Sequence, residues 1–160
     1  MKTILLATDG SASARRATEE AIELALETGW SLQIVSVWSP PKAMVGYGVI
    51  VPLDAGGDAE RQQAENVVDA AAEKARAAGL QPKTAVRRGN PASEICARAG
   101  VIGADLIVIG SHGRGPVKRA ALGSVSTRVL HHAPCPVLIV RGDIGAGPGS
   151  RRSERAAAVR

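Results

Sequence analysis

The chain reads Leu106-Ile-Val-Ile-Gly-Ser-His-Gly-Arg-Gly-Pro-Val-Lys-Arg-Ala-Ala-Leu-Gly-Ser-Val-Ser126, an apolar run followed by a glycine-rich loop and the start of a helical pattern. Gly110 and Gly113 stand at the exit of the expected strand, and nine residues separate Gly113 from Gly123. Glycine allows a tight turn and a close approach of ligand to backbone, and a helix start offers unpaired N–H groups to an anion. The stretch therefore predicts a phosphate cradle. The basic residues beside it are Arg114, Lys118 and Arg119.

The composition predicts a single α/β domain. The 160 residues are 45% apolar and only 2% aromatic, with no Phe, so the core depends on Ala, Val, Leu and Ile. Such side chains suit helices packed on a parallel sheet that is buried on both faces. Binders of single-stranded nucleic acid need aromatic stacking platforms, and the net charge of +5 is typical of a solvated surface. Nucleic acid is therefore not the expected partner.

The cysteines and apolar runs indicate the compartment. Cys96 and Cys135 are the only cysteines and lack metal-site spacing, which predicts two small buried side chains in a reducing environment. The run at residues 3–7 is too short for a signal peptide, and no stretch has the length needed to cross a bilayer. We expect a cytoplasmic protein without a membrane partner.

Apolar runs and helical patterns alternate along the chain. Short strands are predicted at residues 4–7, 32–38, 83–88, 106–109 and 137–140. The first helix is capped by Ser11 or Ser13 and ends at Gly29, and the second has apolar positions at helical spacing over residues 64–75. The third follows Asn90-Pro91, and the fourth opens at Gly123. This order predicts parallel strands joined by right-handed crossovers.

Two segments fall outside this alternation. Residues 39–59 contain several prolines and glycines, and a loop of this length in a compact domain is usually functional or mobile. Residues 142–160 are rich in Gly, Ser and Arg, which predicts a disordered tail, with partner binding as the alternative. The expected organisation is a domain over residues 1–141 and a tail over 142–160.

Spacing alone leaves the role of the glycine loop open. No Gly-Lys-Ser/Thr closes it as in a Walker A motif, and the order of its glycines is not that of a dinucleotide-binding loop. Glycines after a strand can also form a simple turn.

Several motifs together resemble the universal stress protein family. They are Gly110-x-x-Gly113 with Gly123-Ser124 nine residues later, Ile4-Leu-Leu-Ala-Thr-Asp-Gly-Ser11, Gly89-Asn-Pro-Ala-Ser-Glu-Ile95 and His132-Ala-Pro-Cys-Pro-Val137. The resemblance extends over residues 2–141 and implies a Rossmann-like fold: a five-stranded parallel sheet of order 3-2-1-4-5 with helices on both faces. In that order a ligand crevice opens at the carboxyl ends of the first and fourth strands. Ala7 stands where some nucleotide-binding members have proline.

The resemblance also implies a binding site for an adenine nucleotide. Gly110, Gly113, Gly123 and Ser124 match phosphate-contacting positions, and the backbone of Val37 matches the position that holds the adenine edge. Asp9 matches an acidic residue at the ribose and phosphates, where it could also hold water around Mg²⁺; the alternative is a turn or helix-cap aspartate. The other site residues expected in the same turns are Ala7, Thr8, Ser111, His112, Arg114, Val125 and Ser126. The expected ligand is ATP, with AMP or ADP as alternatives, and Mg²⁺ is expected to bind through the phosphates.

Catalytic roles have little support in the sequence. His112 lacks a carboxylate at a spacing that would orient it as a base, and Ser124 lacks the partners of an acyl-transfer nucleophile. His131 and His132 are expected to favour the helix dipole rather than to bind metal. We therefore expect a nucleotide-dependent regulator in the stress response, with at most weak ATP hydrolysis and an unknown regulatory partner. The alternatives are a slow ATPase or adenylate-transferring enzyme, and a member that no longer binds nucleotide.

A homodimer is also expected. In the implied strand order, residues 136–141 form an edge strand whose unpaired backbone groups can pair with a second copy.

Overall fold

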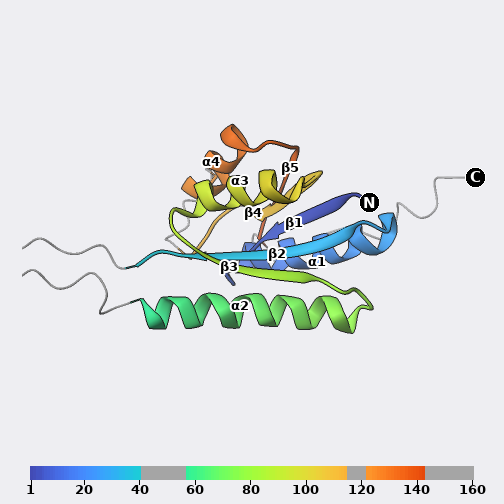
Figure 1. Cartoon of the computed structure of the whole chain (residues 1–160), viewed down its shortest axis with the longest axis horizontal. Helices are drawn as coiled ribbons and strands as arrows, with labels where there is room; N and C mark the ends of the chain where they lie inside the picture. Colours follow the sequence, from blue (N-terminus) through green and yellow to red (C-terminus); the bar gives the residue numbers. More distant parts are fainter. Residues whose placement is uncertain (41–56, 115–121, 143–160) are drawn as a thin grey trace, which may run out of the picture.

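The computed structural model describes residues 1–40, 57–114 and 122–142, and its strands form one parallel sheet in the order β3-β2-β1-β4-β5 (Figure 1). The strands are β1 (Thr3–Ala7), β2 (Ser31–Trp38), β3 (Lys83–Arg88), β4 (Leu106–Gly110) and β5 (Val137–Val140). The helices are α1 (Ala12–Thr28), α2 (Asp58–Ala77), α3 (Pro91–Ile102) and α4 (Ser124–His132). The predicted fold class and strand order are confirmed.

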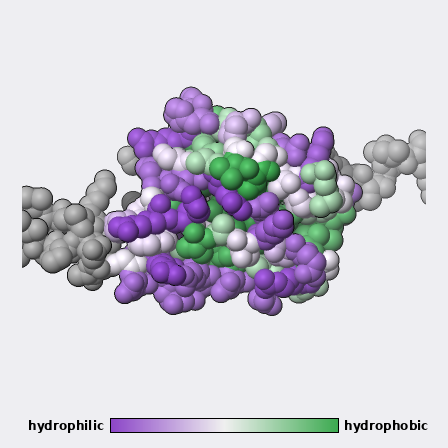
Figure 2. Space-filling model, viewed as in Figure 1, coloured by the Kyte–Doolittle hydropathy of each residue, from purple (hydrophilic) through white to green (hydrophobic). Residues whose placement is uncertain are grey.

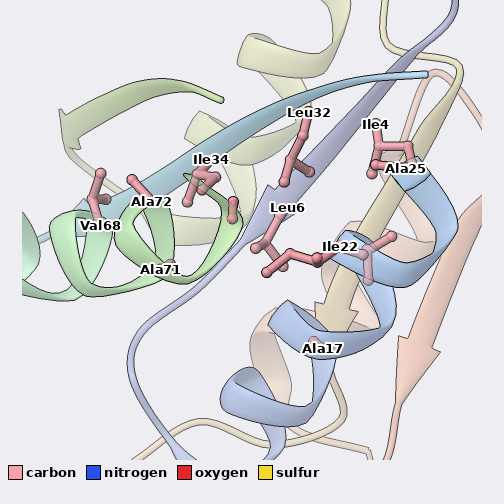
Figure 3. Packing of buried hydrophobic residues seen from close by; sticks show 13 residues of the cluster. Ile4, Leu6, Ala17, Ile22, Ala25, Leu32, Ile34, Val68, Ala71 and Ala72 are labelled. Atoms are coloured by element: carbon pink, nitrogen blue, oxygen red, sulfur yellow. The ribbon is translucent and has the colours of Figure 1, made fainter. Parts of the chain in front are cut away.

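The central strand β1 is buried on both faces of the sheet. Ile4 and Leu6 belong to the cluster packed with α1 and α2, whereas Leu5 and Ala7 belong to the cluster packed with α3 and α4. This division follows from the alternation of side chains along a strand. Figure 3 shows Leu6 between the two helices of the first cluster, with Ile22 of α1 close to it.

Small side chains let the helices lie close to the sheet. Ala17, Ala21 and Ala25 form the buried stripe of α1, and α2 buries a similar row of alanines around Val68. The outward side of α2, at the bottom of Figure 2, is hydrophilic. The low aromatic content is therefore compensated by close packing of Ala against branched strand residues.

The helix ends resolve one open alternative and correct one boundary. Ser11 is the N-cap of α1, with its side chain accepting from the Ala14 N–H, whereas Ser13 lies inside the helix and is buried. Asn90 caps α3 by accepting from the Ser93 N–H, as predicted. The loop predicted over residues 39–59 ends earlier, because α2 begins at Asp58, where acidic side chains in the first turn favour a helix start.

Some predictions lie outside the described residues. They concern residues 41–56 of the predicted loop, Lys118 and Arg119 of the basic cluster, and the tail from position 143 onward. Across the part of the chain that the structure describes, none of the helices is both long and apolar enough to cross a membrane.

Candidate functional site

A cavity of about 390 Å³ lies at the carboxyl ends of β1 and β4. These two strands are neighbours at the centre of the sheet (Figure 1), and the chain leaves β1 toward one face and β4 toward the other. Such a switch in direction opens the crevice in which α/β sheets usually bind ligands. The lining residues are Ala7, Thr8, Asp9, Ala14, Val37, Ile95, Ile109, Gly110, His112, Gly113, Arg114, Gly123, Ser124, Val125 and Ser126.

Ser111 is the one predicted site residue that does not line this cavity. Its side chain is 1% exposed, and its backbone N–H donates to the Val140 carbonyl at 2.7 Å. Its carbonyl accepts from the Gly123 N–H at 2.8 Å and from the Ser126 hydroxyl at 3.0 Å. Ser111 therefore connects the end of β4 to β5 and to the start of α4 through hydrogen bonds, and stabilises the site without lining the cavity.

The first turn of α1 holds the loop that follows β4. The Ser13 hydroxyl donates to the His112 carbonyl at 2.5 Å and accepts from the His112 N–H at 3.2 Å. The Ser11 hydroxyl donates to the same carbonyl at 3.1 Å. Sequence reasoning considered these serines only as helix caps, because their second partner lies about a hundred residues away and becomes a neighbour only through the strand order.

Gly110 and Gly113 have different reasons to be glycine. A Cβ on Gly110 would lie 2.7 Å from the Ala14 nitrogen and 2.8 Å from the Ser13 carbonyl carbon, so α1 packs directly on this backbone. A Cβ on Gly113 would lie 2.8 Å from Oδ2 of Asp9. Gly110 thus serves the packing of the fold as well as lining the cavity, and Gly113 leaves room for a carboxylate.

Asp9 lies where the β1 turn and the glycine loop meet. Its Oδ1 accepts from the Ser11 N–H at 3.0 Å, the contact of a turn aspartate, while its Oδ2 faces Gly113. Nε of Arg114 donates to the Asp9 carbonyl at 2.7 Å, across 105 residues of sequence. Asp9 therefore has the role of a turn aspartate, which the sequence offered as an alternative. Its second carboxylate oxygen remains directed at the glycine loop.

The start of α4 forms one wall of the cavity. Gly123 is its N-cap and provides no side-chain hydrogen bond to the first turn. The first N–H groups of a helix lack intrahelical partners and favour an anion. The Ser126 hydroxyl is bonded to the Ser111 and Gly123 carbonyls, whereas Ser124 is exposed. Of the two predicted serines, Ser124 has the side chain placed to reach a ligand.

Part of the cavity lining is apolar. Val37 and Val125 were predicted there, and the structure adds Ala14, Ile95 and Ile109. Ile109 is the last apolar residue of β4, and Ile95 lies in the second turn of α3. The strand and helix patterns predicted both as core residues, and only their position at the sheet edge places them in the cavity. Apolar side chains of this kind suit contact with a ring of a ligand.

His112 lines the cavity with one ring nitrogen already engaged. Its Nδ1 lies 3.0 Å from the Ser111 hydroxyl. Within the described residues, no group of three or more His, Cys, Asp or Glu side chains is arranged to hold a metal ion.

Comparisons with known proteins agree with this architecture. The family model described as universal stress protein family matches residues 1–141. The universal stress protein YxiE of Bacillus subtilis is 36% identical over 145 residues, covering 86% of this chain and 97% of that protein. The structure of UspA from Lactobacillus plantarum has a TM-score of 0.75 at 28% identity, covering 88% of this chain and 97% of that one. A universal stress protein from Archaeoglobus fulgidus in complex with dAMP shares the fold, with a TM-score of 0.64 at 23% identity, over 88% of this chain and 97% of that one. The family match over nearly the whole described fold, together with the Bacillus relative, shows that this chain belongs to the universal stress protein family.

Proposed function

We propose that this protein binds an adenine nucleotide, ATP together with Mg²⁺, and acts as a nucleotide-dependent regulator in the stress response. The observation that carries the proposal is one corner of the cavity, where Gly113, the carboxylate of Asp9 and the uncapped start of α4 meet. The helix start favours the phosphates. The carboxylate beside them favours a ligand that also brings hydroxyl groups or a cation.

The lining of the cavity offers both kinds of surface that a nucleotide needs. Gly113, Gly123 and Ser124 contribute backbone and hydroxyl groups, and Ile95 and Ile109 contribute apolar surface. A volume of about 390 Å³ lies in the usual range of small-molecule sites, about 300–1,000 Å³. The Archaeoglobus fulgidus protein of the same fold is in complex with dAMP. For this chain, nucleotide binding is inferred from the residues that line the cavity.

The proposal favours a binder over an enzyme. Rapid phosphoryl transfer needs a group that positions water or an acceptor near the terminal phosphate. Asp9 is the one carboxylate among the described lining residues, and it is already bonded to the Ser11 N–H. His112 is bonded to Ser111 through Nδ1. A slow ATPase or an adenylate-transferring enzyme, the alternative, would have to use one of these two groups.

The regulatory role needs a difference between the empty and the occupied site. Arg114 now donates to the Asp9 carbonyl, which ties the glycine loop to the turn after β1. Phosphates at the start of α4 would compete for this guanidinium, so occupancy would change the loop that a protein partner could recognise. A ligand shifts such an equilibrium only by its difference in affinity for the two arrangements.

We also propose a homodimer through β5. This strand pairs only with β4, so its other edge is open among the described residues. Leu138 on β5 is 39% exposed, and Leu130 on α4 is 50% exposed. An unpaired strand edge with apolar neighbours is a ready surface for a second copy.

The proposed domain covers residues 1–141, with 142–160 as a separate tail, and the proposed location is the cytoplasm. In support of the boundary, strand β5 ends at Val140, one residue before the proposed limit of the domain.

The test begins with the nucleotide that accompanies the purified protein, identified by mass spectrometry. Calorimetry on nucleotide-free protein then compares ATP with AMP, with and without Mg²⁺. We expect an ATP dissociation constant in the micromolar range, about −8 kcal/mol, and weaker binding of AMP because it lacks the outer phosphates. Absence of binding by both ligands would favour the family member that works through protein contacts alone.

A pair of glycine variants provides the control. Gly123→Val would place side-chain atoms near the Ser111 carbonyl, since Cβ alone lies 3.1 Å from that oxygen. We expect it to abolish ATP binding while the circular dichroism spectrum is retained. Gly100→Val, on the exposed side of α3 with nothing within 4 Å, should bind ATP as the wild type does. Equal affinity in both variants would contradict the phosphate cradle.

A further inference from the structure

A second cavity, of about 380 Å³, lies between α1 and α2. These helices cover the same face of the sheet, side by side (Figure 3). Of the described lining residues, the two cavities share only Thr8, at the end of β1. The residues around the second cavity are Thr8, Gly10, Arg15, Thr18, Gln63, Asn66, Val67, Ala70, Ala71 and Lys74.

The charge of this lining has one sign. Arg15 on α1 and Lys74 on α2 contribute two cations from opposite walls, and the described lining contains no carboxylate. Lys74 is paired with Glu19, whose Oε1 lies 4.0 Å from Nζ of Lys74 and whose Oε2 lies 3.7 Å from Nη1 of Arg16. These side chains are about half exposed, so the pairing is weak. The cavity therefore attracts an anion.

The guanidinium of Arg15 is held in place. Its Nη1 donates to the Gly10 carbonyl at 2.8 Å, which leaves other donors of the fork for a ligand. Gly10 itself has φ of 77°, and a Cβ there would lie 2.9 Å from Val67 of α2. The turn that accepts the Arg15 hydrogen bond is thus packed tightly against the opposite helix, so this contact directs the exposed guanidinium toward the groove.

The rest of the lining suits the organic part of a ligand. Gln63 and Asn66 add carboxamides, which can donate to and accept from hydroxyl groups. Val67, Ala70 and Ala71 form an apolar strip beside them. The volume is larger than a free inorganic anion needs and lies within the range of small-molecule sites.

We propose that this second cavity, a groove between α1 and α2, is a second binding site, for a small phosphorylated metabolite whose phosphate lies between Arg15 and Lys74. A phosphate is favoured over a carboxylate because its dianion and three oxygens can accept from the fork of Arg15 and from the ammonium group of Lys74 together. The site is separate from the nucleotide cavity and does not depend on nucleotide binding there.

The test uses inorganic phosphate and glucose 6-phosphate as probes. Their binding is measured by two-dimensional NMR of the ¹⁵N-labelled full chain at constant ionic strength. We expect saturable shifts of the Val67, Ala70 and Ala71 amides with both probes, and tighter binding of the sugar phosphate. Arg15→Gln and Lys74→Gln should each weaken binding about tenfold. Arg61→Gln, which removes another exposed cation of α2 that pairs with Glu65 outside the groove, should leave the affinity unchanged.

Further arms separate the groove from its alternatives. Glucose should cause no shift, and glucuronate should bind more weakly than glucose 6-phosphate; equal binding of glucuronate would overturn the assignment to phosphate. Gly123→Val, which is expected to abolish ATP binding at the first cavity, should retain groove binding, so the two proposals can fail independently. No saturable shift with either phosphate probe, or shifts unaffected by both cation variants, would overturn the proposed site.

Discussion

Replacing Gly110 by alanine is expected to destabilise the whole fold, not only to weaken a ligand. The new Cβ would lie 2.7 Å from the backbone nitrogen of Ala14, where ordinary van der Waals contact begins at 3.4 Å. The first turn of α1 would have to retreat by about 0.7 Å, because two of the three nearest atoms are backbone and cannot rotate away, the third being Oγ of Ser13 at 2.5 Å.

The cost follows from packing and from hydrogen bonds. Overpacking of this kind costs about 1–3 kcal/mol. A retreat of α1 also lengthens the bonds between the Ser13 hydroxyl and the His112 backbone, each worth about 1 kcal/mol. We expect a loss of about 2–3 kcal/mol, which lowers Tm by about 6–12 °C for a domain of this size.

Urea unfolding followed by far-UV circular dichroism measures this loss by linear extrapolation. The matched control is Gly100→Ala, also a glycine-to-alanine change, at an exposed position of α3 with nothing within 4 Å. Alanine should stabilise that helix by as much as about 1 kcal/mol. Glycine-to-alanine substitution would then lower the free energy of unfolding at position 110 and raise it at position 100. A Gly110→Ala protein within about 0.5 kcal/mol of wild type would refute the packing argument.

The remaining predictions concern the site, the strand edge and the thiols. Asp9→Ala should weaken binding of ATP with Mg²⁺ about tenfold, as expected for a lost charge-assisted contact. Hydrolysis should stay far below the roughly 1–100 s⁻¹ of kinases, and turnover near one per second that is lost in this variant would identify an enzyme. Wild-type protein should be a dimer in light scattering and Ile139→Pro a monomer; a dimer that survives this change would exclude pairing through β5. Burial raises the pKa of the Cys96 thiol, and burial followed by the charge of Asp105 raises the pKa of the Cys135 thiol. Both should therefore react with DTNB at pH 7.5 more slowly than in unfolded protein. The stability linked to these protonated thiols should be present below the thiol pKa of the unfolded chain and be lost as the pH rises toward the raised folded values. Thiol reaction equally fast in folded and unfolded protein would contradict that effect.

The choice of Ile139 for the dimer test depends on the register of β5. The carbonyls of Pro136 and Val140 accept from Ile107 and Ser111 of the β4 segment. In a parallel ladder the bonding direction alternates along the strand, so the groups of Leu138 also face β4 and those of Ile139 face the open edge. From the sequence alone, Leu138 or Val140 would have been chosen for a proline, and either would disrupt the sheet itself.

Much of the architecture can be predicted from neighbours in the sequence. Among the described residues, apolar runs and helical spacing located the strands and the first two helices, the Asn90-Pro91 pair predicted the start of α3, and Gly123-Ser124 predicted the start of α4. These features are local, because capping and amphipathic patterns depend on residues within about four positions of each other. The motif spacing then identified the family, and with it the strand order that the structure confirms.

Only the tertiary structure decided which residues share the candidate site and what each one does there. It separated Gly110, which lets α1 approach, from Gly113, which faces Asp9, although the two are equivalent in the sequence pattern. It buried Ser111 as a support and brought Ile95 into the cavity. The physical reason is that such contacts join segments about a hundred residues apart, whose distance is set by the order and register of strands in the sheet. Local propensity cannot encode that distance, because it carries no information about which strand lies beside which.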